Sequence, residues 1–388
     1  MISQERCCGC SACVNVCPLN CITMVMNGEG FFIPQIEQNK CLQCHLCDKV
    51  CPVEHGGENK SEKRPEVYVG FHQDPEIRLS SSSGGIFTAI AEIILKEQGV
   101  VYGAAMRDDC YGVDQARVTS NEDLHKLRGS KYVQSNVGKT FRQASEDLKN
   151  GRQVLYTGTP CQIEGLKSYL GKEYNNLICM DFVCHGVPSE KAWKSYVQLQ
   201  EKKYGSIAQK ASFRDKVTGW KDFSYSIYFE DGQKYSKPFE EDLFGATFVR
   251  NADLRKCCYD CAFKKINRVS DITVADAWGI EQSKPEFFDN YGTSLIYVHS
   301  AKGKKVLAEI GNKLKFAECT EKECQGWYSG LTHNAEKHPQ RDLFYQHIDE
   351  MPFDKLVRKY AKPSLKKRIV YVLRKIGLLD FTKRAMKR

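Results

Sequence analysis

Residues 153–170, QVLYTGTPCQIEGLKSYL, decide the fold of this 388-residue chain. Residues 153–156 predict a strand, and residues 163–170 have the apolar spacing of a helix. The loop Gly158-Thr159-Pro160-Cys161-Gln162 joins the two. A strand that leads directly into a helix is the unit of an α/β protein, so we expect a sheet covered by helices.

The same alternation continues on both sides of this stretch. Further strands are predicted at 67–71, 100–103, 177–183, 272–274 and 295–298, and further helices at 86–96 and 137–150. Residues 223–235, which turn at Asp231-Gly232, predict an antiparallel hairpin. We therefore predict an α/β body with a mixed sheet, divided into residues 66–205 and 206–350.

The first 51 residues hold ten of the 19 cysteines, arranged as a repeat. The spacing Cys-x2-Cys-x2-Cys-x3-Cys-Pro occurs twice, 34 positions apart. Three thiolates on one tight loop can hold three corners of a 4Fe-4S cubane, while the cysteine before proline reaches the other cluster. Residues 1–55 are therefore predicted to form a small α+β ferredoxin-like domain with two 4Fe-4S clusters. The predicted ligands are Cys7, Cys10, Cys13 and Cys51 for one cluster and Cys41, Cys44, Cys47 and Cys17 for the other.

Structural zinc sites are the alternative for these cysteines. Zinc loops, however, do not require two identical four-cysteine runs that each end in proline. Cys8 adjoins a ligand, but only Cys7 keeps the two-residue gap to Cys10, and Cys21 is interpreted as a core residue. The polar residues 56–65 predict a linker.

Three loops of the body carry chemical signals. Ser80-Ser81-Ser82-Ser83-Gly84-Gly85 precedes the helix at 86–96, where it either caps the helix or binds an anion such as a nucleotide diphosphate. Cys161 begins a helix, where we expect a lowered thiol pKa and a role as nucleophile or metal ligand. Cys184-His185-Gly186 follows the next strand, at the same sheet edge as Cys161.

A Cys-x2-Cys pair, Cys258 and Cys261, completes a set of four soft ligands with Cys161 and Cys184. These residues fit a third 4Fe-4S cluster, a catalytic dyad of Cys161 and His185, or plain core cysteines. The spacing alone does not distinguish the three. It also leaves open whether Cys257 or Cys258 is the ligand.

Six motifs occur in the order seen in the family of coenzyme F420 hydrogenase/dehydrogenase beta subunits, which the chain resembles over about residues 66–330. Their joint occurrence is more specific than any one of them. Members of that family bind FAD and a 4Fe-4S cluster, and they pass electrons between the cluster and an organic acceptor at the flavin. The motifs are Ser83-Gly84-Gly85, Gly129-Ser130-Lys131-Tyr132-Val133-Gln134-Ser135, Gly158-Thr159-Pro160-Cys161-Gln162, Cys184-His185-Gly186-Val187-Pro188-Ser189, Cys258-x2-Cys261 and Asp271-Ile272-Thr273-Val274-Ala275-Asp276-Ala277-Trp278-Gly279.

The resemblance implies that Cys161, Cys184, Cys258 and Cys261 ligate a third 4Fe-4S cluster. It also implies that FAD lies against the serine–glycine turn and the loop at 129–135. The candidate flavin contacts are Ser83, Gly84, Gly85, Gly129, Ser130, Lys131, Tyr132, Gln134, Ser135, Gly158 and Thr159.

Individual roles follow from the same resemblance. Lys131 is a candidate partner for phosphate or for the N1–C2=O edge of the flavin, where a cation stabilises the reduced form. His185 is the candidate catalytic residue, through a hydrogen bond to a cluster sulfur or a position near the flavin. Asp276 and Trp278 are candidates to pack on the flavin or the third cluster, or are a buried pair at a strand end.

The predicted function is that of an iron–sulfur flavoprotein oxidoreductase. Electrons from a low-potential donor, either reduced ferredoxin or another redox partner protein, pass through the clusters to FAD and on to an organic two-electron acceptor, or in reverse. The alternative is a non-catalytic electron-transfer subunit that feeds a partner enzyme. A homo-oligomer is compatible with both.

The excess positive charge behind the net charge of +9 lies in the C-terminal tail. Residues 362–388 hold ten Lys or Arg and one Asp, which leaves 47 basic and 47 acidic residues in 1–361, so no nucleic-acid groove is expected. No apolar run is long enough to cross a bilayer, and free thiols suit a reducing compartment, so we predict a cytoplasmic protein. The helical basic tail within 351–388 either lies on an anionic membrane at its inner face or is solvated.

Overall fold

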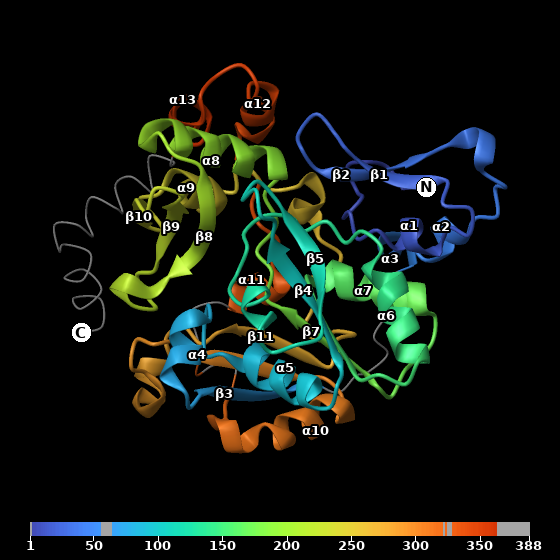
Figure 1. The fold of residues 1–388 in the computed structure, drawn as a ribbon, viewed down its shortest axis with the longest axis vertical. Helices are drawn as coiled ribbons and strands as arrows, with labels where there is room; N and C mark the ends of the chain where they lie inside the picture. The colour runs from blue at the N-terminus through green and yellow to red at the C-terminus, as the bar shows by residue number, and fades with distance from the viewer. Residues whose placement is uncertain (1, 56–63, 321–322, 324–327, 363–388) are drawn as a thin grey trace, which may run out of the picture.

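The chain forms an N-terminal domain and a larger body, described for residues 2–55, 64–320, 323 and 328–362 in a computed structural model (Figure 1). The N-terminal domain pairs two antiparallel strands and packs its helices beside α6 and α7 of the body. Its elements are α1 (Ala12–Val16), β1 (Ile22–Met26), β2 (Phe32–Ile36), α2 (Leu46–Lys49) and α3 (Pro52–His55).

The core of the body is an eight-stranded mixed sheet in the order β13-β3-β12-β11-β7-β6-β4-β5. Its central strands β11, β7, β6 and β4 run parallel, and antiparallel strands flank them on both sides. The predicted fold class is confirmed. The strands are β3 (Glu66–His72), β4 (Val100–Met106), β5 (Val113–Val118), β6 (Val154–Thr157), β7 (Leu177–Phe182), β11 (Ile272–Asp276), β12 (Ser294–Val298) and β13 (Leu314–Glu318).

Helices cover both faces of this sheet. Leu155 of β6 packs into one core with α5 and α10, while its neighbours Val154 and Tyr156 pack into another core with α6 and α7. Alternate residues of a strand point to opposite faces, so both faces are apolar. Each fully buried aliphatic side chain contributes roughly 1.5–3 kcal/mol. The helices are α4 (Pro75–Ser80), α5 (Ile86–Lys96), α6 (Thr140–Lys149), α7 (Pro160–Leu170) and α10 (Ala301–Glu309).

The predicted hairpin at 223–235 exists, but it belongs to a separate three-stranded sheet in the order β10-β9-β8. The large sheet is therefore mixed because of its flanking strands, and the inference of a mixed sheet from this hairpin was wrong. The remaining strands and α-helices are β8 (Ala208–Asp215), β9 (Ser224–Phe229), β10 (Lys234–Pro238), α8 (Glu190–Tyr204), α9 (Leu243–Val249), α11 (Tyr328–Thr332), α12 (Arg341–Gln346) and α13 (Phe353–Tyr360).

Short 3-10 helices complete the structure at η1 (Gln38–Lys40), η2 (Leu124–Lys126), η3 (Lys216–Thr218), η4 (Lys256–Asp260), η5 (Ile280–Gln282), η6 (Pro285–Phe287) and η7 (Gly311–Lys313). Helix α7 begins three residues before its predicted start and so includes Cys161. Most of the predicted linker and nearly all of the basic tail lie outside the described residues. Within the part of the chain that the structure describes, no helix is long and apolar enough to span a membrane.

Candidate functional site

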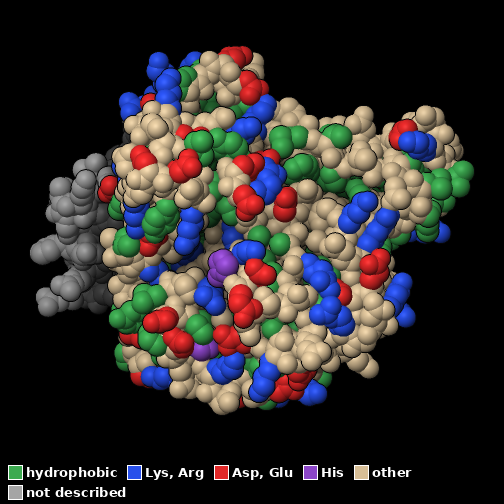
Figure 2. Space-filling model, viewed as in Figure 1, with side chains coloured by type: hydrophobic (Ala, Val, Ile, Leu, Met, Phe, Trp, Pro, Cys, Tyr) green, Lys and Arg blue, Asp and Glu red, His purple; other side chains and the backbone are tan. Residues whose placement is uncertain are grey.

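A cavity of about 1020 Å³ lies where the carboxyl ends of β6, β7 and β11 meet residues of the three-stranded sheet. Figure 2 shows the surface hollowed between these two parts, with Lys and Arg side chains along the hollow. The cavity gathers the candidate site residues of the body. Only Gly84 among the candidate flavin contacts is not on its wall. Gly84 packs too closely behind the wall for a side chain, because a Cβ there would lie 2.6 Å from the carbonyl oxygen of Gly70.

The serine-rich loop does not cap α5. The N-cap residue of this helix is Gly85, in the left-handed region with φ +84°, and no side chain caps the helix. The Oγ of Ser83 instead donates to the carbonyl of Thr293, 2.8 Å away. The interpretation as a side-chain cap is therefore wrong, and the helix N-terminus faces the cavity in a form suited to an anion.

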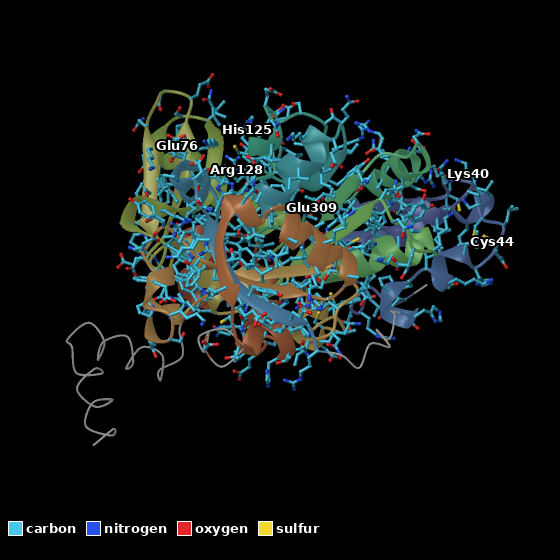
Figure 3. All side chains as sticks on the ribbon, turned by 90° about the horizontal axis from the view of Figure 1, so that it is seen from below. Lys40, Cys44, Glu76, His125, Arg128 and Glu309 are labelled. Carbon is cyan, nitrogen blue, oxygen red and sulfur yellow. The ribbon has the colours of Figure 1, made fainter. Side chains whose placement is uncertain are left out.

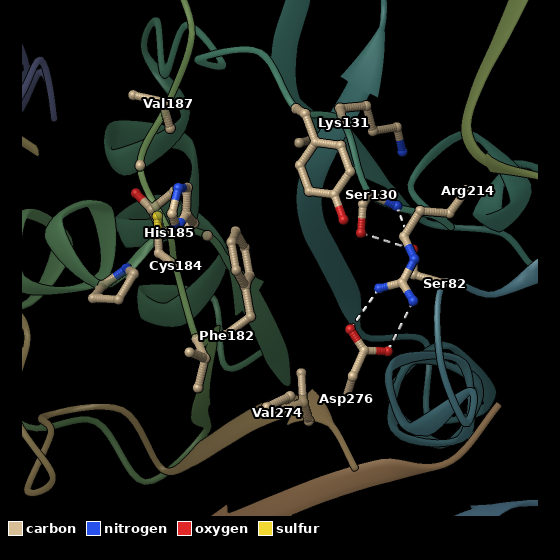
Figure 4. A pocket seen from close by; sticks show the side chains of 18 of the residues that line it. Ser82, Ser130, Lys131, Phe182, Cys184, His185, Val187, Arg214, Val274 and Asp276 are labelled. Atoms are coloured by element: carbon tan, nitrogen blue, oxygen red, sulfur yellow. Dashed lines mark hydrogen bonds and ion pairs between the residues drawn. The ribbon is translucent and has the colours of Figure 1, made fainter. Parts of the chain in front are cut away.

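Two loops of the predicted flavin site are tied together at this helix end. The Oγ atoms of Ser82 and Ser130 lie 2.8 Å apart, and the backbone N–H of Ser130 donates to the Oγ of Ser82 at 2.6 Å (Figure 4). Arg128 also lines the cavity, and its guanidinium donates to Ser80 and Thr88. The loops are thus held together by direct hydrogen bonds.

Arg214 is a cavity residue that sequence reasoning missed. It is buried on β8 and forms a two-point ion pair with Asp276, with N···O distances of 2.6 and 3.0 Å (Figure 4). The indole N–H of Trp220 donates to the same carboxylate at 2.9 Å, and the rings of Trp220 and Trp278 stack. No motif surrounds Arg214, so only the fold brings it to Asp276.

Lys131 and His185 both line the cavity but already have partners. The Nζ of Lys131 donates to the carbonyls of Lys126 and Arg128 at 2.9 and 3.0 Å. Nε2 of His185 lies 2.6 Å from Oδ1 of Asn251. Their roles toward flavin or cluster remain predictions.

The four candidate thiols of the third site lie on one wall of the cavity. Cys161 and Cys184 follow the parallel neighbours β6 and β7, as expected, and Cys258 and Cys261 come from η4 and the residue after it. Burial, followed by Cys258, Cys161 and Cys261, raises the pKa of Cys184. Burial raises the pKa of Cys261 to about 12, and Cys161 and Cys258 act in the same direction. The four thiols are therefore mutual neighbours.

The thiol of Cys161 does not have the lowered pKa expected at a helix start. Its hydrogen bond with Cys8, together with burial, raises its pKa well above the ordinary value. The neighbouring thiols and the low exposure outweigh the helix N-terminus. His185 bonds to Asn251, so these contacts do not favour a dyad of Cys161 and His185.

The N-terminal cysteines gather at two places, and how they divide between two clusters stays a prediction. Cys7, Cys10, Cys13 and Cys51 line one small pocket of about 30 Å³, together with Cys47 of the second predicted group. Cys17, Cys41 and Cys47, and also Cys13 of the first predicted group, pack around Cys21, which is buried as predicted, with its sulfur 3.4 Å from that of Cys17. The fourth predicted ligand of this second group, Cys44, is exposed at the tip of the domain, far from the body (Figure 3).

The first N-terminal group abuts the third site. Cys8 lines both the small pocket and the large cavity, and its thiol interacts with Cys10 and with Cys161. Gly165 on α7 permits this approach, because a Cβ there would lie 3.0 Å from the Sγ of Cys10. Among the described residues, no three His, Cys, Asp or Glu side chains converge on a point for a single metal ion. A cubane binds each thiolate at a different iron and so needs no such convergence.

Both the cysteine repeat and the cavity place the protein in the class of iron–sulfur electron-transfer proteins. Residues 6–55 match the family model of the 4Fe-4S dicluster domain. Residues 67–142 and 151–323 match the N-terminal and C-terminal models of the coenzyme F420 hydrogenase/dehydrogenase beta subunit. The chain therefore belongs to the family of coenzyme F420 hydrogenase/dehydrogenase beta subunits, and it carries an N-terminal 4Fe-4S dicluster domain.

Two individual proteins are similar to this chain. A subunit of the F(420)H(2) dehydrogenase of Methanosarcina mazei is 23% identical over 312 residues, which cover 75% of this chain and 82% of the relative. A chain in the solved structure of the xenon-derivatized F420-reducing [NiFe] hydrogenase complex from Methanosarcina barkeri is 17% identical, with a TM-score of 0.47. The match covers 76% of this chain and 91% of that one.

Proposed function

We propose that this protein is an iron–sulfur flavoprotein oxidoreductase. In this proposal, electrons from a low-potential donor pass through the two N-terminal clusters and a third 4Fe-4S cluster to FAD, and on to an organic two-electron acceptor, or in the reverse direction. The name of the Methanosarcina mazei relative suggests the deazaflavin coenzyme F420 as the organic partner.

One observation carries the proposal: the cavity that receives the α5 N-terminus also has the four thiols of the third site on its wall. A cluster on that wall and a cofactor in the cavity would therefore be neighbours. Cys8 extends this arrangement to the first N-terminal group. In this proposal the clusters would form a continuous series from the tip of the N-terminal domain to the cavity.

The residues present fit FAD. The N-terminus of α5 has Gly85 as its N-cap residue and no side-chain cap, so it suits a diphosphate, and Arg128 supplies a cation beside it. Gly158 and Thr159 line the cavity on the side of Cys161. When bound, FAD supplies the capacity to store two electrons that arrive singly and to release them as hydride.

The ion pair of Arg214 with Asp276 and the stacked indoles of Trp220 and Trp278 form a rigid wall. This wall would exclude water from one side of the cofactor and fix its position. Lys131 would contact a phosphate or the N1–C2=O edge of the flavin, and His185 would donate a hydrogen bond to a cluster sulfur or lie near the flavin. Reducing conditions preserve thiol ligands, so the cytoplasm is the proposed location.

The test is iron, acid-labile sulfide and flavin analysis of the anaerobically purified protein. Three four-iron clusters require close to twelve irons per chain, with one FAD. A content near eight irons would contradict the third cluster, and a protein without flavin would contradict the assignment as a flavoprotein. A colourless zinc protein would contradict both.

An electron-transfer subunit that feeds a partner enzyme is a second candidate, favoured by the surface at the tip of the N-terminal domain. Cys44 is exposed there, and the neighbouring side chain of Leu42 is 75% exposed. Leu46, on the other side of Cys44, is exposed as well, and an apolar patch beside a predicted cluster ligand suits contact with another redox protein. Reoxidation of the dithionite-reduced flavin by F420 without any partner protein would favour the enzyme. Redox cycling only with a partner would favour the electron-transfer role.

A further inference from the structure

Arg255 is a buried cation at the junction of the N-terminal domain and the body. It is 3% exposed. Its Nε donates to the carbonyl of Cys7 at 2.7 Å, and its two terminal nitrogens donate to Oε1 of Gln134 at 2.7 Å and to the carbonyl of Phe32 at 3.0 Å. All three acceptors are neutral oxygens.

Among the described residues, the other buried arginines each pair with a carboxylate. These pairs are Arg78 with Asp289, Arg214 with Asp276, Arg268 with Asp181, and Arg341 with Glu29. Arg255 forms no ion pair with any carboxylate in the described part of the chain. A buried charge without a counter-charge costs several kcal/mol, so the site needs a negative charge that carboxylates do not supply.

The groups around Arg255 are the cysteines of two sites. Its guanidinium backs the first cysteine loop so closely that a Cβ on Gly9 would lie 2.9 Å from its Nη1. Arg255 also directly precedes η4, which carries Cys258 of the third site, and its main-chain carbonyl accepts from the backbone N–H of Cys258 at 2.9 Å.

We propose that Arg255 is the shared counter-cation of the first N-terminal cluster and the third cluster. This inference rests on the proposed function, because it requires the third cluster. A 4Fe-4S cluster with four thiolates carries net negative charge, and its net charge and hydrogen bonds set its reduction potential. A fixed cation between two clusters raises both potentials and keeps them matched.

The electron transfer that Arg255 would serve is balanced. One electron leaves the first cluster, which is oxidised by one unit, and enters the third, which is reduced by one unit. The guanidinium stays protonated throughout. The total charge next to Arg255 does not change when the electron crosses, so the cation can remain in place.

The test is an anaerobic redox titration of the full-length protein, followed by electron paramagnetic resonance. In Arg255→Gln, the midpoint potentials of the first and third clusters should both become more negative, by at least a tenfold change in the reduction equilibrium, or about 59 mV for one electron. The second N-terminal cluster should shift less, and Arg255→Lys should restore both potentials toward their original values. The signals are assigned with Cys184→Ser, which should lack the third cluster.

Gln134→Glu is a second variant that keeps Arg255 in place. It puts a carboxylate where the amide now accepts from Nη1, and should neutralise the cation and lower the same two potentials. Arg142 provides a matched control, because its guanidinium donates to the carbonyl of Cys17, a ligand of the other N-terminal cluster, at 2.7 Å. Arg142→Gln should shift that cluster and leave the third unchanged.

Unchanged potentials in both Arg255→Gln and Gln134→Glu, with near twelve irons retained, would overturn the role of Arg255 and leave the proposed function intact. Equal shifts of the third cluster in Arg142→Gln and Arg255→Gln would also overturn it. Wild-type protein with eight irons would instead remove the proposed third cluster itself.

Discussion

The two N-terminal cysteine groups and the third site are built in different ways. Eight predicted N-terminal ligands lie within 45 residues, on short loops of one small domain. The four body thiols span 101 residues and come from the first turn of α7, the loop after β7, η4 and the residue after η4. The former depend mainly on local spacing, whereas the latter depend on the order of strands in the large sheet.

The local groups are readable from sequence and should survive changes in the body. The third site should be sensitive to any change in the strands or loops that bring its thiols together. The junction between them, where Arg255, Gln134 and Cys8 meet, belongs to both. The following variants separate the two kinds of site.

Loss of one body thiol should have the largest effect. Cys184→Ser should reduce the iron content from near twelve to near eight per chain, because one weak ligand in place of a thiolate removes a whole cubane. The N-terminal clusters should retain their spectra. Cys257→Ser is the matched control and should keep all iron; if it loses the third cluster while Cys258→Ser retains it, Cys257 is the ligand.

The ion pair of Arg341 with Glu29 tests how independent the N-terminal domain is. Arg341 is fully buried on α12, and Glu29 lies in the turn between β1 and β2. Arg341→Gln should lower the free energy of unfolding by about 3 kcal/mol, because it leaves the carboxylate without its partner. Urea unfolding measures this.

The exposed pair of Lys191 with Asp349 serves as its control, because Lys191 also contacts the β1–β2 turn through the carbonyl of Gly28. Lys191→Met should lower the free energy of unfolding by less than about 1 kcal/mol. Equal losses in both variants would mean that the buried pair does not hold the domain in place.

Asp253 should make the body, and not the N-terminal domain, less stable as pH rises from about 4 to about 7. It is fully buried, burial raises its pKa to about 7, and one of its oxygens has no hydrogen-bond partner. Since the folded pKa exceeds the unfolded value, its contribution is complete below about pH 4 and is lost as pH rises through about 7, by at most about 1.4 kcal/mol per pH unit. Asp253→Asn should flatten this dependence in thermal melts between pH 5 and 8. An unaltered slope would exclude Asp253 as its source.

The hydrogen bonds between Ser82 and Ser130 should give the smallest effect. Ser82→Ala removes the tie between the two loops of the proposed flavin site, and a neutral hydrogen bond contributes about 1 kcal/mol. Flavin should bind about fivefold more weakly in a fluorescence titration. Ser81→Ala should leave the affinity for flavin unchanged, because the Oγ of Ser81 donates to the carbonyl of Ile77 and not to a loop of the proposed flavin site. Equal affinity in both variants would mean that the tie does not shape the site.

Sequence reasoning recovered what is local or periodic. The cysteine repeat, the strands of the parallel core and the helices α5 and α7 follow from spacing within a few residues. The pairing of strands does not: residues 223–235 form the expected hairpin, yet nothing in them says which sheet they join. Arg214 and Arg255 were missed for the same reason, because their partners Asp276 and Gln134 lie 62 and 121 positions away.

The absence of a side chain at Gly165 has a consequence for protein engineering. The first N-terminal group and α7 approach so closely that a Cβ at position 165 would lie only 3.0 Å from the Sγ of Cys10. Electron tunnelling slows exponentially with distance, so in the proposed electron path a longer separation at this contact would slow transfer between the two parts of the molecule. An alanine at position 165 would push the first N-terminal group away from α7. Residue 165 is therefore the position at which the rate of the proposed electron transfer could be changed without replacing any predicted cluster ligand.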